Sequence, residues 1–413
     1  MRYSDEDQAP TAYIDLGRIV HNYQVYCKLA AAGWEGREPP KAPRAPMATG
    51  EAPLAVWPSV MAVVKADAYG HGLAETALAL QKAGVSAFAA GSVWEAVRLR
   101  RTLIPYPSGE GPLVIALLGF MNSEEASLCR IHGVIPLLHS FEQLGLIREQ
   151  GILFPFTVAI KCNTGMSRLG FNEEELAALK EELRFLPWIK PVLALSHLHS
   201  AGEEGGWENV RGQALVFRRM LDSLREVWPE MAASLANSAG LCFAKEIAEL
   251  TGPQISRAGL GLYGLSPMPR DTGSFLRSSL LPAMSVGTPI LATRRLRPGD
   301  GLGYGHAYTA KRAMNVGFAA AGYADGLFFA LSNRGGMCVA GRRAPILGRV
   351  CMQMTALDLG ESGLENASGQ TAWILGGPHP NAVTAEEIAS AGGTHVYEVV
   401  CSLGRNRRIH VDE

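Results

Sequence analysis

The sequence predicts an α/β fold, in which an N-terminal closed (β/α)8 barrel is followed by a C-terminal mainly-β domain. Two observations predict the barrel: short apolar runs alternate strictly with amphipathic helical segments, and the alternating part is close to the roughly 250 residues typical of this fold. A third observation predicts the second domain, because the chain changes after about residue 278 to short β-type runs broken by glycine.

The elements before the barrel are predicted from capping and periodicity. Residues 11–14 read as a strand, and a strand at about 9–14 could pack with the C-terminal domain. Asp15 is a suitable N-cap for a helix over 16–32. Proline, glycine and charge dominate residues 33–58, which we expect to be a surface insertion because this composition disfavours helices and central strands.

The alternating region predicts eight strands and the helices that connect them. We expect domains at 11–278 and 279–413. An open doubly wound sheet is the alternative, but no Gly-x-Gly-x-x-Gly turn follows the first strand. The strands are expected at 61–64, 85–89, 113–117, 134–138, 156–160, 192–197, 233–236 and 254–257, and the helices at 73–83, 93–103, 123–131, 141–149, 172–186, 210–227 and 240–250.

The C-terminal domain is expected to be almost entirely β-structure. Only residues 385–391 have a helical pattern. The expected strands are 288–292, 316–320, 337–339, 344–347, 371–375 and 395–400.

Composition limits the classes of partner. Of 413 residues, 38 are lysine or arginine and 39 are aspartate or glutamate, which argues against a nucleic-acid or membrane partner and favours a small molecule. Seven cysteines without zinc-site spacing suggest reduced thiols and no metal site. The polar N-terminus and the absence of a long apolar stretch lead us to expect a cytoplasmic protein.

Polar residues follow several predicted strands at the end where barrel enzymes place their active sites. Lys65 follows the apolar run 61–64, either as an interior lysine whose stem packs against apolar neighbours or as a desolvated nucleophilic amine. A basic mouth with hydroxyls and glycines suits a phosphate and a carboxylate. The other residues at these ends are Lys161, Arg168, His197, His199, Asn237, Ser238 and Arg257.

These residues lie within motifs whose order along the chain resembles the alanine racemase family of pyridoxal phosphate-dependent, fold type III enzymes. Residues 64–72 (Val-Lys-Ala-Asp-Ala-Tyr-Gly-His-Gly) resemble the family's cofactor attachment motif. The similarity extends from about residue 11 to the C-terminus, except for the insertion. The other motifs are at 164–170, 196–198, 237–239, 257–259, 303–305, 322–326, 348–352 and 397–399.

The resemblance implies a two-base alanine racemase that interconverts L- and D-alanine and supplies D-alanine for peptidoglycan. Lys65 would carry pyridoxal 5'-phosphate and act as one base, and Tyr304 would be the second base, supplied by the partner subunit of a homodimer. Arg168 and Met352 would bind the substrate carboxylate. The other implied roles are a carbamylated lysine at Lys161 and cofactor contacts by Tyr69, His197, Asn237, Ser238, Arg257, Gly259 and Leu260.

Several positions depart from the family pattern and leave substrate choice open. Gln353 stands where aspartate is common, Phe329 where some members have arginine, and Asn163 where aspartate is common. Gly404 stands where bacterial members often carry a tyrosine. A racemase that prefers serine or another small amino acid is therefore an alternative.

The same residues are also compatible with other functions and with purely structural roles. A decarboxylase on the same plan would be expected to offer a carboxylate to the pyridine nitrogen, and Arg257 argues against it. A non-catalytic cofactor carrier would not need Tyr304 or the β-domain. From the residues alone, Tyr304 could be a hairpin turn residue, His197 a core histidine, Arg257 an ion-pair partner, and Asn237 with Ser238 a helix cap.

Overall fold

The computed structural model describes residues 10–36, 57–106, 111–149, 155–269, 274–360 and 367–411. The chain divides into two compact units. The barrel unit comprises Ile19–Ala68 and Leu73–Leu281, and the C-terminal unit comprises Tyr69–Gly72 and the parts of the chain up to Arg18 and from Pro282 onward. The expected insertion at 33–58 lies outside the described residues, except for its two ends.

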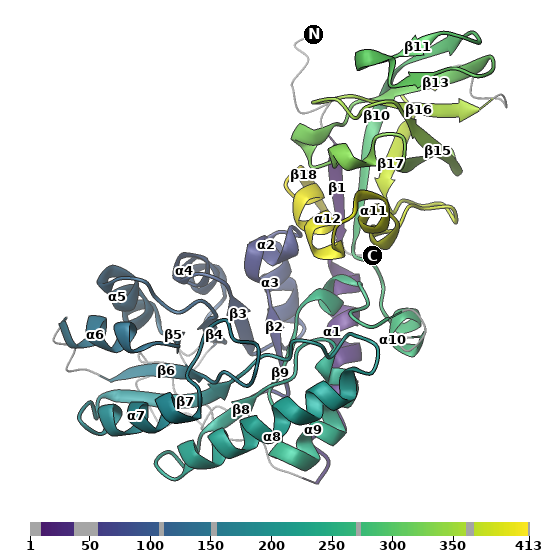
Figure 1. The fold of residues 1–413 in the computed structure, drawn as a ribbon. Coiled ribbons are helices and arrows are strands. Elements are labelled where there is room, and N and C mark those ends of the chain that lie inside the picture. The colour runs from purple at the N-terminus through teal and green to yellow at the C-terminus, as the bar shows by residue number, and fades with distance from the viewer. Residues whose placement is uncertain are drawn as a thin grey trace. The chain divides into compact units, whose positions relative to one another are not determined.

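The barrel unit is an all-parallel sheet of eight strands in the order β8-β7-β6-β5-β4-β3-β2-β9 (Figure 1). Its two ends approach each other, because the Ile255 N–H donates to the Ala233 carbonyl at 2.8 Å and the Arg257 N–H to the Ala236 carbonyl at 2.9 Å. The predicted barrel is therefore confirmed as a nearly closed one. Its strands are β2 (Val60–Val63), β3 (Ala87–Ala90), β4 (Leu113–Ala116), β5 (Val134–Leu138), β6 (Phe156–Lys161), β7 (Ile189–Leu195), β8 (Ala232–Ser234) and β9 (Ser256–Ala258).

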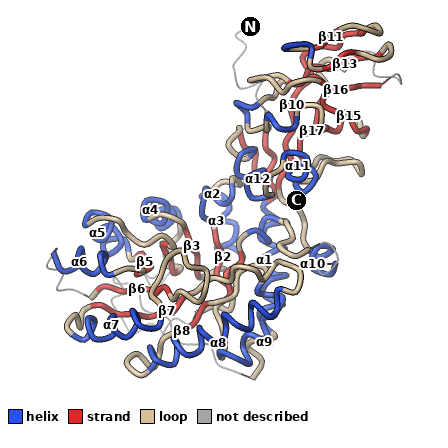
Figure 2. Tube along the Cα trace, viewed as in Figure 1, coloured by secondary structure: helices blue, strands red, loops and turns tan. Residues whose placement is uncertain are grey.

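Helices lie outside this sheet, as Figure 2 shows by colour. Among the described residues, four of them begin at a capping side chain: Asp15, as predicted, Ser92, Asn122 and Asn172 accept hydrogen bonds from the N–H groups three positions later. The helices are α1 (Leu16–Ala31), α3 (Leu73–Lys82), α4 (Val93–Thr102), α5 (Ser123–His132), α6 (Phe141–Glu149), α7 (Glu173–Arg184), α8 (Gly206–Arg225), α9 (Ala244–Thr251) and α10 (Ser274–Ser279), with 3-10 turns η2 (Gly240–Phe243) and η3 (Leu260–Tyr263).

The segment after β2, α2 (Lys65–Tyr69), is a left-handed turn that the sequence pattern does not predict. Ala66, Asp67, Ala68 and Tyr69 have φ of 54–55°. Left-handed backbone costs about 1–2 kcal/mol for each residue with a Cβ, so consecutive non-glycine residues in this region need surrounding contacts to hold them.

The C-terminal unit is built on a second eight-stranded sheet in the order β13-β16-β15-β14-β17-β10-β1-β18, with an additional pairing of β13 with β10. Strand β1 is antiparallel to β10 and parallel to β18. The strands are β1 (Thr11–Asp15), β10 (Met284–Leu296), β13 (Met314–Ala319), β14 (Gly336–Val339), β15 (Arg342–Leu347), β16 (Thr355–Gly360), β17 (Thr371–Leu375) and β18 (Arg407–Val411), besides the small pair β11 (Gly301–Leu302) and β12 (Tyr308–Thr309).

One predicted strand of this unit is wrong. Residues 396–400 belong to α12 (Val396–Leu403) and His395 is its N-cap, so α11 (Ala385–Gly392) is not the only helix here. The β-branched residues of this segment favour a strand, but Val399, Val400 and Leu403 are buried at helical spacing, and this packing overrides the local propensity. Strands β11, β12, β16 and β18 were not predicted from the sequence.

Within the described ranges, no helix combines the length and the apolar character that a bilayer span requires.

Candidate active site

Lys65 and Arg257 come from neighbouring strands of the barrel. Strands β2 and β9 are paired in parallel, with Met61 opposite Arg257, and Lys65 follows two residues after β2 ends. Lys65 is exposed in the single chain, whereas the Arg257 residue is only 3% exposed. The two cations therefore begin at one edge of the sheet but have opposite environments.

Arg257 is held by acceptors from β8 and from the end of β7. Its Nη1 donates to the Ser234 carbonyl at 3.0 Å and to the Ser234 hydroxyl at 2.5 Å. Its Nη2 donates to the Ser196 carbonyl at 2.6 Å and contacts the Leu235 carbonyl at 3.3 Å. Burial lowers the pKa of Arg257 to about 9, which still leaves the guanidinium protonated at neutral pH.

The imidazole of His197 contacts Arg257. The distance from Arg257 Nη2 to His197 Nδ1 is 3.3 Å, and because arginine can only donate, Nδ1 is the acceptor and the ring proton lies on Nε2. Burial holds the pKa of His197 well below its usual value, and the charge of Arg257 lowers it further. His197 is therefore a neutral ring at physiological pH.

Lys161 ends β6 and lies in the same electrostatic environment. The residue is 8% exposed. Burial lowers its pKa to about 7, and the positive charges of Arg257 and Arg168 act in the same direction. A large fraction of this amine is therefore uncharged at neutral pH, and the uncharged form is the nucleophilic one.

Arg168 is exposed on the loop that follows β6. Asn163 organises this loop, because its Oδ1 accepts the N–H groups of Gly165 at 3.2 Å and Ser167 at 3.0 Å. Ser167 has a φ of 52°, a left-handed conformation that these bonds help to hold. The amide oxygen of Asn163 thus supplies the acceptor that holds this loop.

A buried polar chain connects this loop to β7 and α8. The Ser196 hydroxyl donates to the Cys162 carbonyl at 2.8 Å, so the Thr164 hydroxyl donates to Ser196 at 2.7 Å, and Gln213 Nε2 donates to Thr164 at 3.0 Å. Gln213 also donates to the His197 carbonyl at 3.0 Å. Gln213 was not predicted from the sequence, since nothing in the helical pattern of α8 distinguishes it.

The turns after β8 and β9 bring Asn237 and Ser238 together with Gly259. Asn237 accepts the Gly240 N–H at 2.9 Å and donates to the Leu198 carbonyl at 3.1 Å, which are the contacts of a helix cap. Ser238 accepts the Gly259 N–H at 2.8 Å. Because Ser238 acts here as an acceptor, its own O–H remains available to donate.

Tyr304 and Met352, by contrast, belong to the C-terminal unit. Tyr304 begins the 3-10 turn η4 (Tyr304–His306) and is 72% exposed. Met352 is exposed too, and its carbonyl accepts the Ala324 N–H at 2.9 Å. Gly303 and Gly305, with φ of 70° and 67°, allow the backbone to turn on both sides of Tyr304.

Comparison with known proteins identifies the family of this chain. The family description "Alanine racemase, N-terminal domain" matches residues 54–267, and "Alanine racemase, C-terminal domain" matches residues 283–411. The chain belongs to the alanine racemase family. It is therefore an isomerase of the amino acid racemase class, and the family depends on pyridoxal phosphate.

Individual relatives agree with this family. An alanine racemase of Nitratidesulfovibrio vulgaris is 41% identical over 358 residues, which are 85% of this chain and 91% of that protein. The structure of an alanine racemase from Streptomyces lavendulae covers 98% of both chains with a TM-score of 0.80 and 27% identity. An alanine racemase from Bartonella henselae with covalently bound pyridoxal phosphate covers 98% of this chain and 99% of its own, with a TM-score of 0.77 and 26% identity.

The donor set of the barrel mouth fits the cofactor of the alanine racemase family. Arg257 has only donors, and its Nε–H makes no hydrogen bond among the described residues, which suits a pyridine nitrogen that accepts. The Ser238 O–H, which has no acceptor among the described residues, and the backbone beside it suit phosphate oxygens.

Gly404, which departs from the expected pattern, lies in a crowded part of the C-terminal unit. A Cβ at Gly404 would be 2.2 Å from the Gly70 carbonyl oxygen, and one at Gly70 would be 2.6 Å from the Val400 carbonyl oxygen. Tyr69, beside Gly70, is buried with its ring centroid 6.0 Å from that of Tyr397. The two glycines therefore allow a close backbone contact next to Tyr69.

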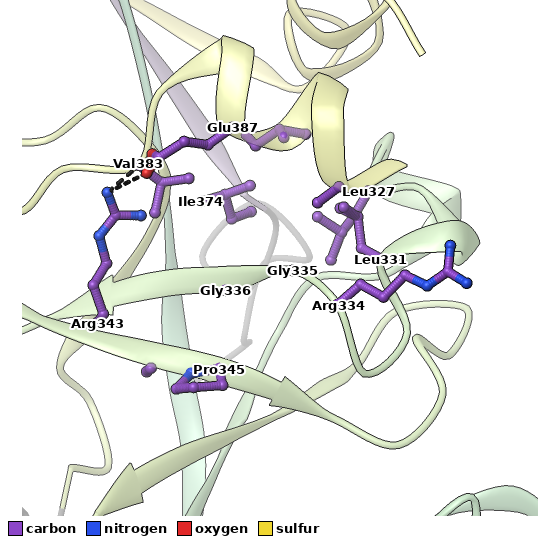
Figure 3. Close-up of a pocket in the computed structure, with 13 residues that line it drawn as sticks. Leu327, Leu331, Arg334, Gly335, Gly336, Arg343, Pro345, Ile374, Val383 and Glu387 are labelled. Atoms are coloured by element: carbon purple, nitrogen blue, oxygen red, sulfur yellow. Dashed lines mark hydrogen bonds and ion pairs between the residues drawn. The ribbon is translucent and has the colours of Figure 1, made fainter. Parts of the chain in front are cut away.

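A pocket of about 440 Å³ in the C-terminal unit contains none of the expected site residues. Ile374, Leu327 and Leu331 line it, and the ion pair of Arg343 with Glu387 at 2.9 Å borders one side (Figure 3). Glu387 is also the capping-box residue of α11, which explains the ion pair as a structural one.

Proposed function

We propose that this protein interconverts L-alanine and D-alanine with pyridoxal 5'-phosphate, using Lys65 and Tyr304 as bases on opposite faces of the substrate. The observation that carries the proposal is the locked, donor-only Arg257 beside the strand of Lys65. An arginine that stays protonated at neutral pH would leave the pyridine nitrogen unprotonated, which would restrain side reactions such as transamination. A carboxylate at this position would favour the decarboxylase alternative.

The barrel, residues 11–278, would hold the cofactor, and the β-rich domain, residues 279–413, would supply Tyr304 and Met352. When bound, pyridoxal phosphate supplies an electron sink for the α-carbon. Arg168 and the Met352 amide would bind the substrate carboxylate. Lys65 would carry the cofactor. The other residues proposed to contact the cofactor are Tyr69, His197, Asn237, Ser238, Arg257, Gly259 and Leu260.

Racemisation requires a proton to leave one face of the α-carbon and another to arrive at the opposite face. Lys65 Nζ would serve one face and the Tyr304 hydroxyl the other. His197 is neutral and accepts from Arg257, so it would keep the guanidinium oriented without taking a proton itself. If each base serves one face, loss of one base should block racemisation, while one enantiomer should still exchange its α-proton.

A Tyr304→Phe variant tests whether each base serves one face of the α-carbon. We expect racemisation to fall about 10²–10⁴-fold, the usual contribution of a general acid–base group. Exchange of the α-proton with deuterium, followed by NMR, should continue from one enantiomer only. Racemisation at an undiminished rate would refute the role of Tyr304.

We further propose a homodimer in which each site combines Lys65 of one subunit with the partner's Tyr304. The exposure of Tyr304 supports a role at a surface that a second chain covers. Mixing inactive Lys65→Ala and Tyr304→Phe subunits should restore about one quarter of wild-type activity if subunits exchange at random, because half of the dimers then carry one intact site. No recovery in proven mixed dimers would place both bases in one chain.

Substrate choice and physiological role follow from the same site. Alanine is the proposed substrate, and the product D-alanine would feed peptidoglycan synthesis in the cytoplasm. Gln353 and Phe329 change the polarity proposed for the entrance, so serine is the informative competitor. Parallel assays of D-enantiomer formation from L-alanine and L-serine decide the preference, and carbon dioxide release from lysine or ornithine would favour a decarboxylase.

We propose that the Lys161 amine is carbamylated. Its uncharged fraction near pH 7 can react with carbon dioxide, and the resulting carbamate would offer acceptor oxygens to the positive charges of Arg257 and Arg168. Carbon-13 NMR with labelled bicarbonate should give a carbamate signal in the wild type that is missing in Lys161→Met. Equal signals from both proteins would exclude the modification.

A further inference from the structure

Lys65 is followed immediately by a segment that does not adopt its conformation on its own. Ala66, Asp67, Ala68 and Tyr69 are all left-handed, and none of them is glycine. The direction in which the chain leaves Lys65 is therefore imposed by contacts from elsewhere.

The carboxylate of Glu95, in the first turn of α4, makes two of these contacts. Glu95 Oε1 accepts the N–H of Asp67 at 2.9 Å, and Glu95 Oε2 accepts the N–H of Gly91 at 2.7 Å. Hydrogen bonds to an ionised acceptor are among the stronger ones in proteins. One side chain thus joins the left-handed turn after β2 to the loop after β3.

The second contact also bears on Lys65. A Cβ built on Gly91 would lie 3.5 Å from Lys65 Cβ and 3.1 Å from Glu95 Oε2. Gly91 therefore forms part of the surface beside the base of the Lys65 side chain. Glu95 holds both this surface and the backbone that follows Lys65.

Asp67 adds a further layer of support. Its Oδ1 accepts the Leu73 N–H at 3.0 Å and lies 3.8 Å from Nη2 of Arg98, which is three residues after Glu95 on α4. The Ala68 N–H also donates to the Val64 carbonyl at 2.9 Å. The first turns of α4 consequently meet the left-handed segment through its backbone and through its one charged side chain.

The next β/α unit of the barrel has a carboxylate at the same helix position, and it serves as a comparison for Glu95. Glu125 occupies the same position in α5, where its Oε2 accepts the Met121 N–H at 2.8 Å and its own N–H donates to the Asn122 cap. Glu95 makes the matching bonds with Gly91 and the Ser92 cap. Glu95 makes these two shared bonds and, in addition, the bond with Asp67.

We propose that Glu95 is a positioning residue for Lys65, which holds the left-handed turn so that the lysine side chain is aimed for cofactor attachment and proton transfer. The inference rests on the proposed function in one respect, that Lys65 is the cofactor-bearing lysine. Glu95 acts through the backbone of Asp67 and Gly91 and takes no part in the chemistry itself.

The test compares Glu95→Ala and Glu95→Gln with Glu125→Ala as the matched control. Both alanine variants lose a carboxylate that caps a loop, so both should lose thermal stability, and Glu95→Ala more because it also loses the bond to Asp67. Of these two, only Glu95→Ala should weaken cofactor binding, by roughly tenfold to a hundredfold, which is the affinity equivalent of one lost hydrogen bond to a charged group. Glu95→Gln keeps one acceptor oxygen and should recover part of the affinity.

Hydrogen exchange of the cofactor-free protein supplies a readout that does not depend on activity. The Asp67 amide should exchange faster in Glu95→Ala and Glu95→Gln than in the wild type, and at the wild-type rate in Glu125→Ala. If Glu95→Ala fails to fold, Glu95→Gln decides the question by the same two measurements.

The outcomes separate this inference from the proposed function. Unchanged Asp67 exchange in the Glu95 variants, or equal cofactor affinity in Glu95→Ala and Glu125→Ala, would overturn the positioning role. A wild-type protein that binds the cofactor through Lys65 but does not racemise alanine would overturn the proposed function, while weaker binding in Glu95→Ala would still support the role of Glu95.

Discussion

Lys65 and Arg257 are two cations at one edge of the barrel, and their surroundings differ in almost every respect. Lys65 is exposed and lies between a strand and a left-handed turn, while Arg257 is buried within its strand and surrounded by acceptors. The support of Lys65 is directed at the backbone beside it, through Glu95. The support of Arg257 is directed at the guanidinium itself.

This difference shows how one sheet edge can provide a reactive amine and a fixed donor. A side chain that must form and break a bond needs freedom at its tip and a rigid base. A side chain that must keep its proton and its orientation needs the reverse. Changing either residue should therefore produce different kinds of damage.

The largest effect is expected for Lys65→Ala. Removing the amine should abolish covalent cofactor attachment and lower racemisation at least about 10³-fold, because the nucleophile and one base are lost together. Mass spectrometry after borohydride reduction measures attachment, and D-alanine formation measures activity. Lys82→Ala, at the exposed end of α3, is the control and should retain attachment.

Arg257→Lys should instead damage stability and cofactor electronics together. Three ammonium donors cannot meet all the acceptors of the guanidinium, and each buried carbonyl left unpaired costs about 1–3 kcal/mol, so we expect a loss of about 2–4 kcal/mol in the free energy of unfolding. Arg100→Lys is the control, since Arg100 donates to the Pro112 and Gly133 carbonyls away from the mouth. Both variants should lose stability, but only Arg257→Lys should shift the cofactor absorbance.

Lys161 is a third basic side chain to compare with Lys65 and Arg257, and burial leaves its amine partly uncharged near neutral pH. Its folded pKa of about 7 lies below the usual value of about 10.4, so the unfolded state binds more protons between these limits. Stability should therefore rise with pH in this window, by up to about 1.4 kcal/mol per pH unit, and the full penalty of the buried charge is present below it.

Urea unfolding of wild type and Lys161→Met, in buffer free of carbon dioxide, measures this contribution. The wild type should gain stability relative to the variant as pH rises from about 7 to about 10. Lys180→Met, which loses an amine paired with Glu226, is the control. A wild-type slope identical to that of Lys161→Met would contradict the lowered pKa.

The smallest effect is expected for Ser234→Ala. Arg257 would lose the Ser234 hydroxyl but keep the carbonyl of the same residue, and the Ile255 carbonyl would lose the hydroxyl that donates to it. Two lost hydrogen bonds correspond to about 2 kcal/mol of unfolding free energy. The urea midpoint gives the value. Ser278→Ala, which removes an exposed hydroxyl bound to the Phe275 carbonyl, should change it less.

The barrel could be predicted from the sequence because its strands are short apolar runs between strongly patterned helices. The segment 134–138 illustrates this, since all five of its residues are buried and its predicted bounds are those of β5. The segment 395–400 was assigned wrongly because Val396, Val399 and Val400 favour a strand locally, and only tertiary packing makes it a helix.

The support of the candidate site could not be predicted in the same way. Ala66 and Asp67 carry no signal for left-handed backbone, and the carboxylate that holds them is 28 residues away from Asp67. The spacing of Ser92 and Glu95 does match a capping box and could have located the start of α4. This spacing could not have revealed the bond from the Asp67 N–H to Glu95, because that bond depends on how close α4 lies to the turn after β2.

The close contact of Gly404 with Gly70 has a consequence for how this sequence can change. A side chain at either position would collide with the backbone of the other segment, so neither glycine can be replaced without moving its neighbour. We expect a single substitution at either position to destabilise the C-terminal unit, unless the backbone of the facing segment shifts to make room for the new side chain.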